Sequence, residues 1–263
     1  MEFILSGFTD PPAFQITLFV LFLAVYIVTL LGNVGLVLLI RLDSQLQTPM
    51  YFFLSNLAFV DFWYSTFITP KFLADQVTER KAISYAGCVW QYSLTSFFGV
   101  TESFLLAVMA YNRYMAICNP LLYTAVMSLR LYVQLVAGLF LAGFVNGMIQ
   151  TITTLKLSFC GSNVTDLFFC DISPLLALSC SETHLKEKVM FAATLFISGC
   201  SRLTILVSYS YVLVTILHNC SAEGRCKAFS TGTPHITLVS ISYGTILFMY
   251  LQPAFISLQQ QDQ

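Results

Sequence analysis

The stretch LLAVMAYNRYMAICNPLLY, Leu105–Tyr123, joins the end of a long apolar segment to a polar turn. The apolar segment begins near Cys88 and carries one charged residue, Glu102, before Arg113. A helix needs about 20 apolar residues to cross about 30 Å of hydrocarbon. The stretch therefore predicts a transmembrane helix that ends in a cation, and it raises the question of what Arg113 contacts.

Composition places the whole chain in the same class. Of its 263 residues, 57% are hydrophobic and only 10% are charged, and the mean hydropathy is +0.78. A soluble domain carries about 25% charged residues. This chain has too few charged residues to cover a water-facing surface. The net charge of −1 gives no sign of nucleic-acid binding. We expect an integral membrane protein whose surroundings are membrane lipid.

Six apolar blocks are each long enough to cross a membrane as a helix, because lipid forces backbone groups to pair within their own segment. They predict an all-α, multi-pass transmembrane helix bundle forming one domain, 1–263. A long polar loop, about 153–188, separates the fourth block from the fifth. The expected helices are about 16–40, 50–69, 88–111, 131–152, 189–217 and 229–251.

The loop between the fourth and fifth blocks indicates the orientation. Lysine and arginine counts are nearly equal on the two sides, so they do not decide it. The loop carries Cys160, Cys170, Cys180 and the glycosylation sequon NVT at Asn163. Together with Cys88, these cysteines suffice for two disulfides on the oxidising side. We expect the loop and the N-terminus outside a plasma membrane, with Asn163 glycosylated.

Three ionisable residues lie deep in apolar blocks: Asp61, Glu102 and Arg202. Charge within a membrane is costly, so such residues are candidates for function. Asp61 and Glu102 lie at a similar depth, where two carboxylates can share a cation or a proton. The alternative is two neutral acids hydrogen-bonded to neighbouring helices. The sequence offers no evident partner for Arg202.

The third block also carries a stripe of residues, several of them polar, along one side of its predicted helix. Residues spaced by three or four line one side of a helix, and here they run from the first cysteine to the arginine. A polar stripe in lipid turns toward the bundle, although ordinary helix packing accounts for most of it. The stripe comprises Cys88, Tyr92, Thr95, Gly99, Glu102, Leu106, Met109 and Arg113.

The segment MAYNRYMAIC, Met109–Cys118, resembles the MAYDRYVAIC signature of olfactory receptors, which are rhodopsin-like class A G-protein-coupled receptors. Further motifs agree in order over nearly the whole chain, and the likeness is to the tetrapod-type (class II) branch. They are GN at Gly32–Asn33, LQTPMYFFLSNLAFVD at Leu46–Asp61, SY at Ser208–Tyr209, KAFSTGTPH at Lys227–His235 and YGTILFMYLQP at Tyr243–Pro253.

The resemblance implies roles for particular residues. It implies the disulfides Cys88–Cys170 and Cys160–Cys180, and a sodium site at Asp61 and Glu102. No other cofactor is expected. A stimulatory heterotrimeric G protein would meet the inner end of the third helix. The activation residues would be Asn112, Arg113, Tyr114, Tyr209, His235 and Tyr243.

The resemblance also implies a pocket for a small volatile odorant between the third, fifth and sixth helices. Its side chains are mostly small or apolar with a few hydroxyls, which suits a weakly polar ligand held by shape and one or two hydrogen bonds. The pocket residues would be Thr95, Ser96, Gly99, Val100, Ala193, Thr194, Ile197, Ile246, Leu247 and Tyr250.

Three departures from the family pattern bear on function. Asn112 replaces the usual aspartate beside Arg113, and an amide cannot cancel the arginine's charge, so we expect raised basal signalling. Gly232 and Pro234 stand where the family usually has cysteine and serine. The chain ends at SLQQQDQ with six of the family's seven helices, which implies a fragment or a truncated product.

Two readings compete with an odorant receptor that signals. One is a truncated, non-signalling product of the same family. The other is a transporter or channel, for which inverted repeats or broken helices would be expected and are not evident. An enzyme is not expected, because the sequence shows no nucleophile–base pair and no metal-ligand spacing.

Overall fold

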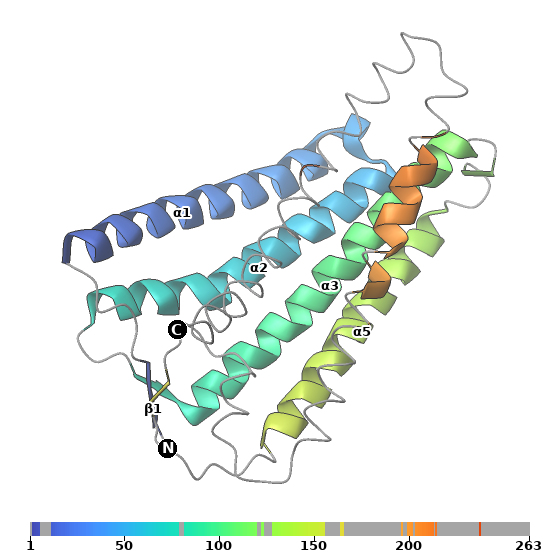
Figure 1. Cartoon of the computed structure of the whole chain (residues 1–263). Helices are drawn as coiled ribbons and strands as arrows, with labels where there is room; N and C mark the ends of the chain where they lie inside the picture. The colour runs from blue at the N-terminus through green and yellow to red at the C-terminus, as the bar shows by residue number, and fades with distance from the viewer. Residues whose placement is uncertain are drawn as a thin grey trace, which may run out of the picture.

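The computed structural model describes residues 2–5, 12–78, 82–119, 122–123, 128–155, 164–165, 196, 199–201, 203–212, 214 and 237. Long helices dominate these residues, which confirms the predicted all-α bundle (Figure 1). The helices are α1 (Pro12–Leu42), α2 (Pro49–Val77), α3 (Tyr85–Cys118) and α5 (Leu129–Leu155), with a 3-10 turn, η1 (Ser44–Leu46), between the first two.

Each of the first four predicted blocks lies inside a longer helix. Apolar composition marks only the part that meets hydrocarbon, whereas capping residues set the helix ends. Pro49 occupies the first turn of α2, where its missing N–H costs nothing. Ser84 caps α3 by accepting a hydrogen bond from the Gly87 N–H. The sixth block, apart from residue 237, and most of the loop 153–188 lie outside the described residues.

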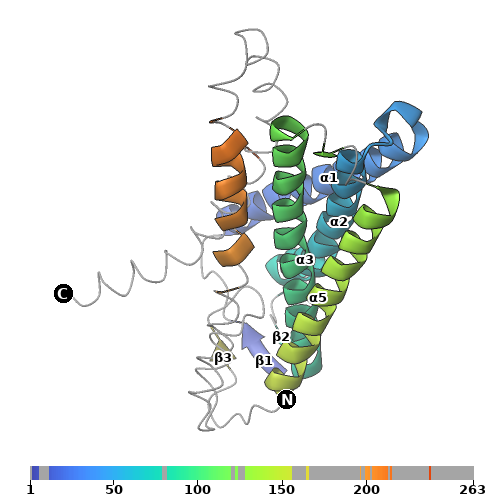
Figure 2. The ribbon, with the colours of Figure 1, turned by 90° about the vertical axis from the view of Figure 1, so that its right-hand side faces the viewer.

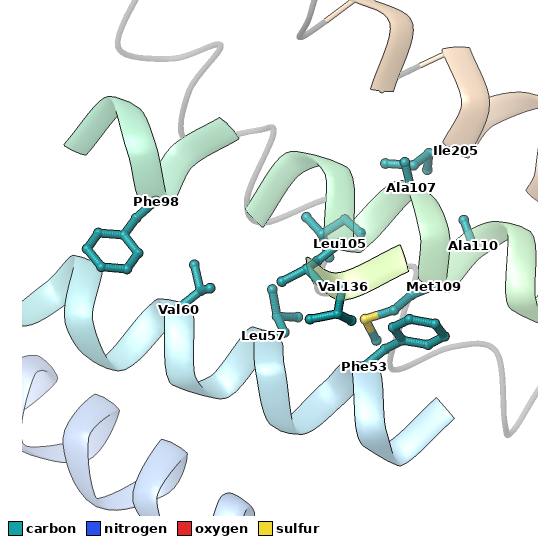
Figure 3. Close-up of a cluster of buried hydrophobic side chains, with 11 residues drawn as sticks. Phe53, Leu57, Val60, Phe98, Leu105, Ala107, Met109, Ala110, Val136 and Ile205 are labelled. Carbon is teal, nitrogen blue, oxygen red and sulfur yellow. The ribbon is translucent and has the colours of Figure 1, made fainter. Parts of the chain in front are cut away.

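The core forms where α2, α3 and α5 meet, and α1 packs on α2 from outside. Figure 3 shows Phe53 and Leu57 of α2, Leu105 and Met109 of α3 and Val136 of α5 turned toward one another. Phe53 and Leu105 are fully buried. α3 therefore packs against both α2 and α5, and no residue of its predicted polar stripe is exposed.

Residues 199–201 and 203–212 belong to the fifth predicted membrane helix, 189–217, and pack on α3. We call them the fifth-helix segment; they are distinct from α5, which is the fourth predicted membrane helix. The segment's buried side chains Ser201, Ile205, Ser208 and Val212 are spaced by three or four residues and so share one face. Ile205 belongs to the same core cluster as Ala107 of α3. Figure 2 shows this segment, coloured orange, running alongside α3.

Three described helices are long and apolar enough to cross a membrane: Gln15–Leu42, Tyr85–Ile117 and Leu129–Leu155. The second predicted span, α2, is not among them. It carries Asp61, Lys71 and Asp75, and Lys71 pairs with Asp75 one turn on. Packing against α1, α3 and α5 shields much of α2 from lipid, so it need not be as apolar as α1.

The N-terminal segment contains a strand that sequence patterning does not indicate. Strand β1 (Glu2–Leu5) pairs antiparallel with β2 (Ala82–Ser84) and parallel with β3 (Val164–Thr165). Residue Ser84 of β2 is also the cap of α3. This small sheet therefore joins the N-terminus to the start of α3 and leaves the fold class unchanged.

Candidate functional site at the end of α3

Asn112 and Arg113 lie in the last two turns of α3. Asn112 is 2% exposed, and Arg113 is half-buried. The helix ends at Cys118, immediately before the Asn119–Pro120 pair, because the residue before a proline disfavours helical conformation. The cation of the opening stretch is thus held inside the bundle end rather than extended into solvent.

Phenol side chains surround the Arg113 guanidinium. Tyr51 of α2, Tyr123 of the turn after α3 and Tyr209 of the fifth-helix segment all lie within electrostatic range of it. Phenol oxygens accept hydrogen bonds but carry no charge at neutral pH. Among the described residues no carboxylate forms an ion pair with Arg113. Three elements therefore bring neutral phenols into the neighbourhood of this arginine.

Asn112 binds one of these phenols. Its side-chain amide hydrogen-bonds Tyr123, which lies between the membrane-spanning segments. Burial raises the pKa of the Tyr123 phenol, and the opposing effects of Asn112 and Arg113 are smaller. The phenol therefore stays protonated at neutral pH and accepts the amide N–H of Asn112 through its oxygen. This bond ties the turn after α3 to the helix itself.

Two polar atoms at this site are buried without a hydrogen-bond partner in the described part of the chain. They are Oδ1 of Asn112 and Nε of Arg113. An unmade hydrogen bond in a buried place costs free energy, and most buried polar atoms in folded proteins have a partner. The amide oxygen of Asn112 and the guanidinium of Arg113 are therefore both incompletely satisfied in this part of the chain.

Aromatic contacts extend the site across the bundle. The ring of Tyr114 lies 5.8 Å from that of Tyr211 in the fifth-helix segment, and 6.2 Å from that of Tyr111. On the other side, the Tyr132 ring of α5 lies 5.1 Å from Phe52 of α2. Any movement of the fifth helix against α3 would disturb the first of these contacts, near Arg113.

The four described pocket candidates do not share one environment. Thr95 donates its hydroxyl to the carbonyl of Gln91, 2.7 Å away. Ser96 instead accepts a hydrogen bond from Asn146 of α5. Gly99 faces α2, since a Cβ added there would lie 3.9 Å from Cε2 of Tyr64. Val100 is half-buried. The pocket assignment of these residues stays a prediction.

Asp61 and Glu102 lie on neighbouring helices, α2 and α3, and both are half-buried. The described residues bring together no group of three or more His, Cys, Asp or Glu side chains that could hold a metal. Two carboxylates fit a sodium ion, which takes oxygen ligands, only if amides, hydroxyls or water complete its shell. The sodium site stays a prediction.

Cys88 is disulfide-bonded and 1% exposed. Its pairing with Cys170 stays a prediction, because that residue lies outside the described part of the chain. The same holds for several other residues singled out above: Cys160, Cys180, Asn163, Ala193, Thr194, Ile197, Arg202, His235, Tyr243, Ile246, Leu247 and Tyr250.

Sequence reasoning did not single out Tyr51, Tyr123 or Asn146. One signal was available for Tyr123, since a tyrosine follows the helix-ending Asn119–Pro120 by a few residues and so lies near the inner boundary. Tyr51 and Asn146 gave no comparable signal, because each is one polar residue in an apolar helix. Their roles appear only when α2 and α5 are packed on α3.

A sequence model of the family described as "Olfactory receptor" matches residues 22–257. The chain belongs to the olfactory receptor family. It is 50% identical to mouse "Olfactory receptor 5G9" over 97% of this chain and 82% of the relative. It is 52% identical to the chicken "Olfactory receptor-like protein COR4" over 95% of this chain and 80% of the relative.

A third relative covers the chain completely. Mouse "Olfactory receptor 5AR1" is 47% identical over 100% of this chain and 84% of its own length. Membership confirms the resemblance and the expectation of a membrane-embedded, multi-pass G-protein-coupled receptor rather than an enzyme. It also removes the reading as a transporter or channel.

Proposed function

We propose that the chain binds small volatile odorants within its helix bundle and activates a stimulatory heterotrimeric G protein from the plasma membrane, with its N-terminus outside. The observation that carries the proposal is the end of α3. There Arg113, with a buried amide beside it, is surrounded by tyrosines from three elements. Because no ion pair holds this arginine among the described residues, movement of the helices can change its position readily.

The bundle geometry supports this coupling. Tyr209 and Tyr211 come from the fifth-helix segment, and each contacts or approaches a residue of the Asn112–Arg113–Tyr114 run. The same segment places Ile205 against the part of α3 that precedes Arg113, in the core cluster that contains Ala107. A ligand that shifts the fifth helix would therefore also alter the surroundings of Arg113. A ligand shifts the equilibrium between the resting and the active state only to the extent that it binds one of them more tightly.

The experiment uses cells that express the full chain with an N-terminal epitope tag. Antibody labelling of intact cells reports surface delivery and an outside N-terminus. A cAMP reporter then reads responses to a broad odorant panel. We expect surface labelling and a dose-dependent rise in cAMP with some odorants. A chain that labels at the surface but gives no cAMP response to any odorant would reject the proposed coupling.

We also propose that Asp61 and Glu102 bind sodium in the resting receptor. An ion that binds only the folded chain stabilises it by mass action. The purified protein is expected to melt at a higher temperature in sodium chloride than in choline chloride of equal concentration. Asp61→Asn is expected to remove this difference. Equal melting temperatures of the unsubstituted protein in the two salts would exclude the site.

A further inference from the structure

The charge of Arg113 has no negatively charged partner among the described residues. Its Nε is buried without a hydrogen-bond partner. The ion pair that the described residues do form, Lys71–Asp75, lies within α2 and does not involve this arginine. A guanidinium carries only donors, so a negatively charged oxygen is the partner that suits it best. The described groups therefore leave the cation at the end of α3 without a counter-charge.

Tyr123 is the phenol best placed to carry an anion to this arginine. It hydrogen-bonds the Asn112 amide, and its oxygen lies within electrostatic range of the Arg113 guanidinium. Its side chain is half-buried, whereas the adjacent Leu122 is 52% exposed. The turn after α3 therefore holds this phenol at the surface of the bundle while directing it toward Arg113.

Its position along the chain separates Tyr123 from the other tyrosines near this site. Tyr111 is 46% exposed, but it belongs to the membrane-spanning segment of α3, where exposure is to lipid. Tyr51 and Tyr209 belong to the second and fifth predicted membrane helices. Tyr123 lies between two membrane-spanning segments. Of these four phenols, it is the one that an enzyme working in water can reach.

We propose that Tyr123 is a phosphorylation site, and that its phosphate supplies the missing counter-charge of Arg113 and so stabilises the resting receptor. A tyrosine kinase on the inner side would transfer the γ-phosphoryl group of ATP. A bond forms between the Tyr123 oxygen and the γ-phosphorus, the bond from that phosphorus to ADP breaks, and the phenol proton passes to the kinase's base. The inference rests on the proposed orientation and coupling.

The chemistry of the phosphate decides the direction of the effect. A phosphotyrosine carries a charge of about −1.5 to −2 at pH 7 and three strong acceptor oxygens. The Asn112 amide, which now donates to the neutral phenol, can donate to one of these oxygens. The guanidinium of Arg113 gains charge-assisted hydrogen bonds, which are stronger than neutral ones. One such bond lowers a small active fraction about tenfold.

The first experiment asks whether the modification occurs. Cells that express the tagged full chain are treated with vanadate, which inhibits tyrosine phosphatases, and the receptor is captured and its phosphopeptides are mapped by mass spectrometry. Phosphate is expected on Tyr123 and not on Tyr111. Tyr123→Phe should lose this phosphate, and Tyr111→Phe, the matched control, should keep it. A captured chain without phosphate on Tyr123 would overturn the inference.

The second experiment asks whether the phosphate acts through Arg113, and it does not depend on signalling. Phosphorylated receptor is purified with an antibody to phosphotyrosine, and half of it is treated with a tyrosine phosphatase. The phosphorylated half is expected to melt at a higher temperature. Arg113→Gln should abolish this difference. Asn112→Asp should also remove it, because its carboxylate accompanies the arginine and repels the phosphate.

Basal cAMP provides the third measurement, compared at equal surface labelling. Vanadate is expected to lower it about tenfold in the unsubstituted chain and to leave it unchanged in Tyr123→Phe. Phosphate on Tyr123 without an Arg113-dependent melting difference overturns the proposed ion pair. An Arg113-dependent melting difference supports the ion pair even where odorants raise no cAMP, a result that rejects only the coupling. Equal effects of vanadate on the two chains, where odorants do raise cAMP, overturn the role in the resting state.

Discussion

Replacement of Gly143 by alanine is expected to destabilise the receptor by about 3 kcal/mol, at the upper end of the cost of overpacking. A Cβ at this position would lie 2.2 Å from Thr101 Oγ1 and 2.8 Å from the Phe97 carbonyl oxygen. A hydroxyl can rotate away, but the backbone oxygen cannot move unless α3 moves. The variant should therefore push α5 from α3, lower the melting temperature and reduce surface labelling severely.

Gly138 provides the matched control on the same helix. A Cβ added there meets nothing within 4 Å, so Gly138→Ala is expected to be neutral or slightly stabilising, as alanine favours helix. Combining Gly143→Ala with Thr101→Ala removes the nearest clash but not that with Phe97, so stability should return only in part. Equal melting temperatures for Gly143→Ala and Gly138→Ala would contradict the close packing of α5 on α3.

Asn112→Asp is expected to lower basal cAMP several-fold without reducing surface delivery. A carboxylate beside Arg113 adds a charge-assisted contact that the amide lacks. The bond to Tyr123 also reverses, because the phenol must donate to a carboxylate, whereas it accepts from Asn112. An added resting-state stabilisation of about 1 kcal/mol lowers a small active fraction about fivefold.

Two comparisons make this prediction specific. Asn119→Asp changes the net charge equally at an exposed position beyond the end of α3, and it should leave basal cAMP unchanged. Tyr123→Phe removes the acceptor of the Asn112 amide and should raise basal cAMP, because the turn is no longer tied to the helix. If Asn112→Asp and Asn119→Asp gave the same basal cAMP at equal surface labelling, the proposed neutral contact would be wrong.

The sequence located the first four helices, the ones that the structure describes over their whole length, because lipid imposes a strong constraint. Apolar length alone located α1, α3 and α5, and the polar stripe of α3 faces the bundle as expected. The helix ends were harder to predict from hydropathy. Ser84 caps α3 through a hydrogen bond, and Pro49 begins α2 because its backbone geometry suits a first helical turn. The strand Glu2–Leu5 had no signal, as its partners lie far along the chain.

The site was predicted only in part, for a related reason. Arg113 and Asn112 stood out by position and family likeness, but the tyrosines around the guanidinium depend on how three elements pack. Residues of the same type also behave differently. Gly143 and Gly138 lie on one helix, and of these two only Gly143 is so placed that an added Cβ would meet α3. Sequence patterning cannot separate such pairs without the contacts.

One measurement tests most directly whether the end of α3 is where this receptor couples. The purified chain is placed in lipid vesicles with a stimulatory heterotrimeric G protein, and GTP binding to that protein is followed with and without an odorant mixture. Odorants are expected to accelerate GTP binding with the unsubstituted chain and to have no effect with Arg113→Ala, although both chains show the same odorant-induced melting shift. Equal acceleration by the two chains, or odorant binding to the unsubstituted chain without acceleration, would contradict the account.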